Sequence, residues 1–186
     1  MFRCWLAAIF FFLYLCGNAI ASEMKSRDFV KGISYELEGR ATMRAITASL
    51  SDRFEEGELH VYWSSYNRLE EFSKGRYEKV ARRLGIELPG NTWILTKAKI
   101  VSFLPEFAIL LVLKDLRERT IVYIDKLQKI AEIGPVEEGE FYGYMIRQEK
   151  LQVELMDLAL SGKYMVADDV VNQFIDRESQ LRRRLL

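Results

Sequence analysis

The residues best suited to acid–base chemistry are few in this chain. His60 is the only histidine among 186 residues, and the two cysteines, Cys4 and Cys16, both lie close to the N-terminus. A lone histidine can act as a general base or as a pH-sensitive contact. At the edge of an apolar helical stripe, however, it is more often a boundary residue. We therefore take His60 as a candidate binding residue, and the sequence singles out no partners for it in a catalytic triad.

The histidine count also limits metal chemistry. Di-iron sites of the ferritin type use a Glu-x-x-His pair on each of two helices, and that pattern does not occur in this sequence. We predict no metal and no cofactor. A carboxylate-only site that uses Glu106, Glu149 or Glu154 remains the alternative. The sequence also lacks a glycine-rich phosphate loop and a Gly-x-Ser-x-Gly elbow, which favours a function other than catalysis.

Glu106 is a second candidate binding residue. It follows Pro105 inside the most apolar internal stretch, residues 100–113, where a buried carboxylate would indicate a functional site. The competing interpretation is structural. Proline suits the start of a helix, and an acidic residue directly after it stabilises the positive helix end. The pattern favours this second reading, with Pro105 marking a kink.

The third candidate comes from two aromatic clusters, residues 62–66 and 141–144. Aromatic side chains at helical spacing usually belong to the core, although those with a polar tip also suit a ligand pocket or a partner surface. Tyr142 lies off the apolar stripe of its segment. We therefore take Tyr142 as the candidate contact residue.

The N-terminus has the order of an export signal. Arg3 precedes an unbroken apolar run over residues 5–15, and the small-residue segment 17–21 ends in an Ala-x-Ala site. The run is too short for a bilayer, which needs about 20 helical residues. We predict a signal peptide at residues 1–21 and one exported domain at residues 22–186, without a stable membrane span after signal removal. A lipid-modified Cys16 is the competing possibility.

Export has consequences for composition. The segment 22–186 contains no cysteine, which excludes disulfides and zinc–thiolate sites within it. Without Arg3 it carries 26 basic and 27 acidic residues. This balance gives no electrostatic reason to expect nucleic acid or anionic lipid as a partner. The expected location is the periplasm in a Gram-negative bacterium, and otherwise the exterior of the cell.

Helical periodicity predicts an all-α fold, an antiparallel up-and-down bundle of four to five long helices. The expected helices cover about residues 26–55, with a possible break at Gly32 or Gly39, then 58–84, a third helix after residue 91, and one each after Pro135 and after residues 161–163. The apolar stretch 100–113 is expected to form a central core helix. Glu70 and Lys74 are expected to pair on an outer helix face.

These features lead to a functional hypothesis. We expect an exported, non-catalytic helical protein that acts by binding another protein, as an envelope accessory factor or as an immunity-type inhibitor of a toxin. The alternative is a bundle that binds a ligand, or a metal through carboxylates, and that could be enzymatic. An interior pocket lined by Tyr and Glu would favour the alternative, and a packed core with an exposed apolar patch would favour the partner-binding protein.

Overall fold

All the regular secondary structure in the described part of the chain is helical. The computed structural model describes the backbone of residues 2–184, and the side chains from residue 27 onward except that of residue 91. The helices are α1 (Phe2–Arg53), α2 (Gly57–Arg83), α3 (Asn91–Ser102), α4 (Glu106–Ile133), the short 3-10 helix η1 (Val136–Glu138), α5 (Gly139–Leu160) and α6 (Val166–Arg184). Residues 2–184 contain no strand, so the predicted all-α bundle is confirmed.

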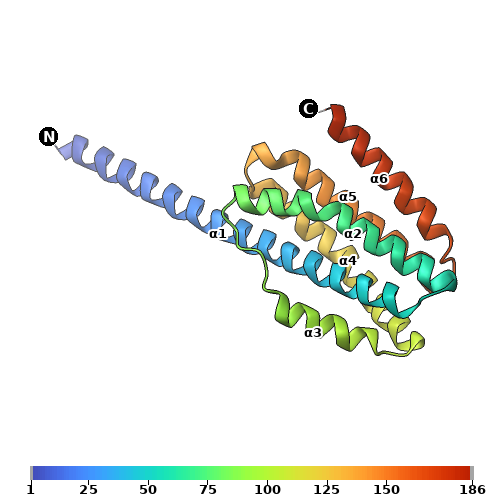
Figure 1. The fold of residues 1–186 in the computed structure, drawn as a ribbon. Coiled ribbons are helices and arrows are strands. Elements are labelled where there is room, and N and C mark those ends of the chain that lie inside the picture. The colour runs from blue at the N-terminus through green and yellow to red at the C-terminus, as the bar shows by residue number, and fades with distance from the viewer. Residues whose placement is uncertain (1, 185–186) are drawn as a thin grey trace.

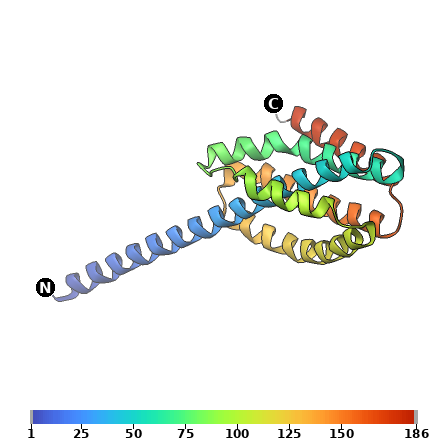
Figure 2. The ribbon, with the colours of Figure 1, turned by 60° about the horizontal axis from the view of Figure 1, so that its bottom comes forward.

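Helix α1 is the element around which the others are arranged (Figure 1). It packs against α2, α3 and α4, while α5 packs on α4 and α2, and α6 lies along α2. The N-terminal part of α1 extends beyond the bundle (Figure 2). The predicted leader, residues 1–21, lies outside the residues whose side chains are described. Within the described part of the chain, no helix combines the length and hydrophobicity required to cross a membrane.

The possible break at Gly32 or Gly39 does not occur, and Gly134 is not a left-handed helix cap. Helix α1 runs without a break through Gly32 and Gly39. At Gly32 the missing side chain has a packing role, because a Cβ there would lie 2.5 Å from Cδ1 of Ile130 on α4. Gly134 follows α4 in extended conformation (φ −80°, ψ 167°), whereas its sequence context suggests a left-handed helix cap. Close packing therefore explains these two positions better than a break or a cap does.

The expected third helix is two helices. Helix α3 ends at Ser102, and α4 begins at Glu106 after Pro105. Proline has no N–H for the helical ladder and its ring crowds the preceding turn, so the chain turns here and does not merely kink. Stretch 100–113 is accordingly not a central core helix. Its buried residues are Ile109 and Leu113, and several of its largest apolar side chains face solvent.

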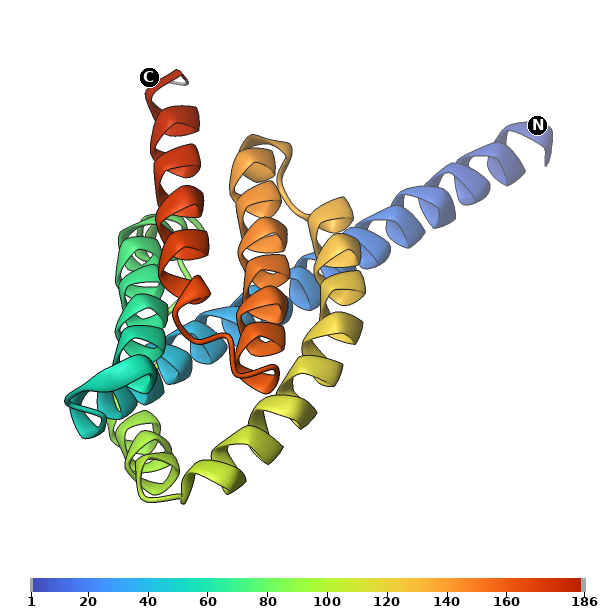
Figure 3. The same cartoon turned by 90° about the vertical axis from the view of Figure 1, so that its right-hand side faces the viewer.

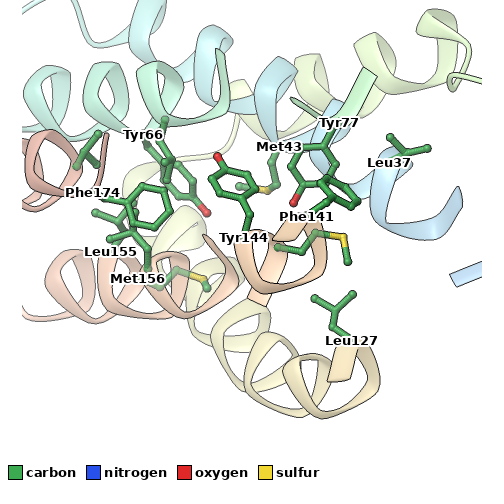
Figure 4. Packing of buried hydrophobic residues seen from close by; sticks show 14 of the residues in the cluster. Leu37, Met43, Tyr66, Tyr77, Leu127, Phe141, Tyr144, Leu155, Met156 and Phe174 are labelled. Atoms are coloured by element: carbon green, nitrogen blue, oxygen red, sulfur yellow. The ribbon is translucent and has the colours of Figure 1, made fainter. Parts of the chain in front are cut away.

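The core lies between α1, α2, α4 and α5 and is rich in aromatic rings (Figure 4). Tyr77 meets Phe141 edge-on at 5.1 Å between ring centroids, and Tyr62 meets Trp63 in the same way at 4.8 Å. The hydroxyl of Tyr144 lies 2.6 Å from Oγ of Ser73. Polar atoms thus enter the centre of the bundle on tyrosine side chains, where they need partners.

Replacing Gly134 with alanine should destabilise the fold. A Cβ at this position would lie 2.5 Å from both Cε2 of Phe29 and the hydroxyl of Tyr142. Its φ and ψ suit alanine, so any loss comes from the clash with two rings, and overpacking of this kind costs about 1–3 kcal/mol. Urea unfolding of Gly134→Ala measures the loss. Gly39→Ala is the control, because its Cβ would meet nothing within 4 Å and helix propensity favours alanine by about 0.5–1 kcal/mol. Equal effects of the two changes would contradict this account.

Candidate functional site

The three candidate residues from the sequence do not form one site. His60 is half-buried, and its Nδ1 lies 2.7 Å from the carbonyl oxygen of Phe54 and 3.3 Å from that of Ser51. Glu106 is exposed in the first turn of α4, as the sequence suggests, and borders a cavity of about 10 Å³ that Phe54 also lines. His60 and Glu106 therefore lie near the end of α1.

Tyr142 lies near the opposite end of the bundled part of α1. Its side chain is buried, and its ring meets Phe29 edge-on at 6.0 Å. Phe29 and Ser51 are about 33 Å apart along α1 at ~1.5 Å per residue. Burial, with a smaller effect from Glu138, raises the pKa of Tyr142 to about 12. The Tyr142 hydroxyl has no hydrogen-bond partner, so this residue is a packed core tyrosine and not an exposed contact.

The most unusual group of side chains in the core surrounds Arg40. Its guanidinium contacts Glu70 from α2 (Nη1 to Oε1, 2.9 Å) and Glu149 from α5 (Nη2 to Oε1, 2.8 Å). On α1 itself, Nε lies 3.3 Å from Oε1 of Glu36. All four residues are buried, and the three carboxyl groups are at most 2% exposed. We call these four residues the Arg40 cluster.

Neighbouring side chains hold the carboxylates in place. The hydroxyls of Tyr77 on α2 and Tyr123 on α4 each donate to Glu36, to Oε1 and Oε2, at 2.9 Å. Gln152 on α5 donates to Oε1 of Glu70 at 3.2 Å. The cluster and its hydrogen-bond donors therefore link α1, α2, α4 and α5 through polar contacts inside the bundle.

The Arg40 cluster has more potential negative charge than positive charge. Three ionised carboxylates around one guanidinium would leave two excess negative charges in a buried site, which is costly. Burial raises the pKa of Glu149, Arg40 lowers it, and the nearby Glu36 and Glu70 raise it; together these effects bring it to about 8. Burial also raises the pKa of Glu70. At neutral pH Glu149 therefore holds a proton, and the excess charge is smaller.

Some polar atoms in this region have no partner among the described residues. Oε2 of Glu70 and the hydroxyl of Tyr66 are buried without a hydrogen bond, as is Nε of Arg40. No group of three or more His, Cys, Asp or Glu residues in the described part of the chain has the arrangement to hold a metal ion. In the Arg40 cluster the guanidinium occupies the centre where a cation would have to bind. The arrangement can store a proton.

Sequence reasoning missed three members of this cluster and named only Glu149. The signal was present, because Glu70 follows Tyr66 by four residues and precedes Tyr77 by seven, which places all three on one helix face. Glu70 is thus buried opposite Arg40, and the expected outer-face pair with Lys74 is wrong. The pattern to look for is a charged residue on the apolar face of one predicted helix and an opposite charge on the apolar face of another. This pattern would have identified the site.

A second candidate site lies on the surface of α3 and α4. Six large apolar side chains there are 60–77% exposed, namely Leu95 and a set of five: Trp93, Ile100, Phe103, Phe107 and Leu111. The two helices meet at the turn that joins them and then diverge (Figure 3), and Phe103 and Phe107 flank that turn. We call these five residues the α3–α4 apolar surface. Patches of this kind on a soluble protein commonly mark an interaction site.

Lysines border this surface. Lys97 lies one turn from Trp93, with Nζ 5.5 Å from the centre of the Trp93 ring, and it also pairs with Glu38 at 3.2 Å. Among the described residues, Lys99 and Lys114 form no ion pair. Glu106 lies at the positive N-terminal end of α4, which offsets its charge. The polar edge of the α3–α4 apolar surface therefore carries uncompensated positive charge.

The comparisons with known proteins identify no relative. The chain matches no family model, no curated protein and no solved structure. The two candidate sites therefore have to be interpreted from their own geometry and charge.

The charge excess around Arg40 predicts an unusual pH dependence. The folded-state pKa of Glu149 is raised to about 8, so the folded protein binds a proton that the unfolded chain releases above about pH 4.5. The free energy of unfolding should therefore fall as pH rises between these values, by at most about 1.4 kcal/mol per pH unit from this group. In Glu149→Gln this contribution is absent. The variant should match the wild type near pH 4.5 and become progressively more stable than it up to pH 8.

Urea unfolding of both proteins at several pH values measures the difference. Glu154→Gln is the matched control, because Glu154 is exposed on the same helix and its replacement should leave the pH profile unchanged. A difference between Glu149→Gln and the wild type that does not vary with pH would contradict the protonated state of Glu149.

Proposed function

We propose that this chain is an exported, non-catalytic protein that binds a partner protein through the α3–α4 apolar surface. The observation that carries the proposal is the exposure of Trp93 on α3, Phe103 in the turn after it and Phe107 at the start of α4. Each such ring contributes ~150–250 Å² when it is buried, and aromatic residues are the usual energetic centres of interfaces. Exposing them together to water is unfavourable unless another surface covers them.

The charge around the surface indicates the chemistry of the partner. Lys99 and Lys114 are exposed and form no ion pair among the described residues, while the centre of the surface is apolar. A complementary partner therefore presents an apolar face bordered by Asp or Glu side chains. An amphipathic helix packed against the turn between α3 and α4 has this form, with apolar anchors spaced at one-turn intervals. An envelope accessory factor and an immunity-type inhibitor both act through contacts of this kind.

The ligand-binding alternative has one observation in its favour, the Arg40 cluster. Titratable groups with strongly shifted pKa values often mark functional sites, although structural ion-pair networks shift them as well. The three carboxylates are already engaged by Arg40, Tyr77 and Tyr123, which supports a structural role for most of the cluster. The partner-binding function therefore has the stronger basis.

Removing two anchors from the α3–α4 apolar surface should abolish partner binding without unfolding the protein. In Phe103→Ser/Leu111→Ser both changed residues are exposed, so stability should change by about 0.5 kcal/mol or less per site. Affinity for the partner should fall at least about tenfold. Crosslinking of tagged protein in its own cell envelope, followed by binding of the recovered partner in purified form, measures this loss.

Val136→Ser is the control, because Val136 is 90% exposed but lies in η1, outside the surface. Charge reversal in Lys99→Glu/Lys114→Glu should also weaken binding, and added salt should reduce the effect of that change. The proposal is wrong if the recovered protein binds the double serine variant as tightly as the wild type. It is also wrong if the surface mediates only association of two copies of this chain.

The export part of the proposal predicts cleavage after Ala21. The described core begins at Phe29, so a mature protein that starts at Ser22 retains every buried residue named above. Intact mass of the envelope or secreted protein should correspond to residues 22–186. A protein that starts at Cys16 with added acyl mass would show instead that the chain is a lipoprotein.

A further inference from the structure

A cavity of about 350 Å³ lies beside the Arg40 cluster, and none of its lining residues belongs to the α3–α4 apolar surface. It is lined by α1, by α2 and by the segment between α2 and α3, and its volume is within the usual range for small-molecule sites. Arg40 and Tyr77 line it together with Arg44 and Lys74, and its apolar lining includes Leu37 and Leu88. The cavity thus combines cationic groups with an apolar wall.

Two of these cations are available to a ligand. Lys74 is exposed and forms no ion pair among the described residues, because Glu70, one turn before it, is buried and contacts Arg40. Arg44 has only a loose partner, Glu71, at 3.8 Å from its Nε. The one acidic residue in the lining, Glu78, lies 3.9 Å from Arg82 outside the cavity. The local charge at the cavity rim is therefore positive.

Arg40 also lines the cavity. The residue is 93% buried, counting from its 7% exposure, and its Nε makes no hydrogen bond although it lies near Glu36. The positive charge of Arg40 is already offset by the carboxylates around it, so Arg44 and Lys74 would supply the charge that attracts a ligand. A ligand that fits this cavity therefore carries a negatively charged hydrogen-bond acceptor for Arg44 and Lys74.

We propose that this cavity binds a small organic anion, a carboxylate or phosphate attached to a short apolar group. The anionic group is held by Arg44 and Lys74, and the apolar group packs against Leu37 and Leu88. This binding function is separate from partner binding by the α3–α4 apolar surface, since the two sites share no residue. Either one can fail without affecting the other.

Isothermal titration with hexyl phosphate, hexanoate and inorganic phosphate at low ionic strength tests the proposal on the full mature chain. We expect one molecule of hexyl phosphate or hexanoate per chain, bound at least tenfold more tightly than inorganic phosphate. Arg44→Gln/Lys74→Gln should weaken binding at least tenfold. Ala41→Leu, which extends a side chain into the cavity, should weaken binding while leaving the rim charges in place.

Lys126→Gln/Lys129→Gln is the matched control, because it removes the same charge from exposed positions on α4. If the control variant weakens binding as much as Arg44→Gln/Lys74→Gln does, the effect comes from overall charge and the proposal is wrong. The proposal is also wrong if inorganic phosphate and hexyl phosphate bind with equal affinity, or if neither hexyl phosphate nor hexanoate binds at millimolar concentrations. Binding to anionic vesicles but to no dissolved anion would overturn it as well.

Discussion

The contacts of Arg40 with three buried carboxyl groups are the constraint on which the centre of this bundle depends. A guanidinium can donate in several directions within one plane, and here it reaches Glu36, Glu70 and Glu149 on three helices. Removing it would leave three carboxyl groups in an apolar core, and breaking a buried ion pair in this way costs about 3–5 kcal/mol. The cluster therefore fixes which faces of α1, α2 and α5 meet.

A second buried carboxylate in the same protein has the opposite charge environment. Glu178 on α6 is contacted by Arg147 (Nε to Oε1, 2.6 Å) and Arg76 (Nη1 to Oε2, 3.1 Å). Burial opposes its ionisation, yet hydrogen bonds and charge from these two arginines lower its pKa. Two arginines on one carboxylate favour its charged form, whereas one arginine among three carboxylates leaves Glu149 protonated at neutral pH. The ratio of charges thus explains why the two pKa values shift in opposite directions.

The sequence predicts the helices well because periodicity and breakers are local signals. The segment 58–84 corresponds closely to α2, and Pro105 marks the start of α4. The stretch 100–113 was misplaced because apolar content indicates only that a surface is hydrophobic. It does not indicate whether the chain itself covers that surface. The turn before Pro105 leaves Phe103 and Phe107 without a covering helix, and nothing local to those residues specifies this outcome.

The same limit applies to Glu70, and its consequences extend across two sites. By spacing alone it can pair with Lys74 on the surface, and only its position opposite Arg40 on α1 determines that it is buried. With Glu70 inside, Lys74 forms no ion pair with any residue that the structure describes, and it lies beside the cavity. The orientation of one side chain therefore helps to neutralise the core and also contributes positive charge to the cavity rim. Both follow from a contact between residues 30 positions apart, which the pattern of a single helix does not reveal.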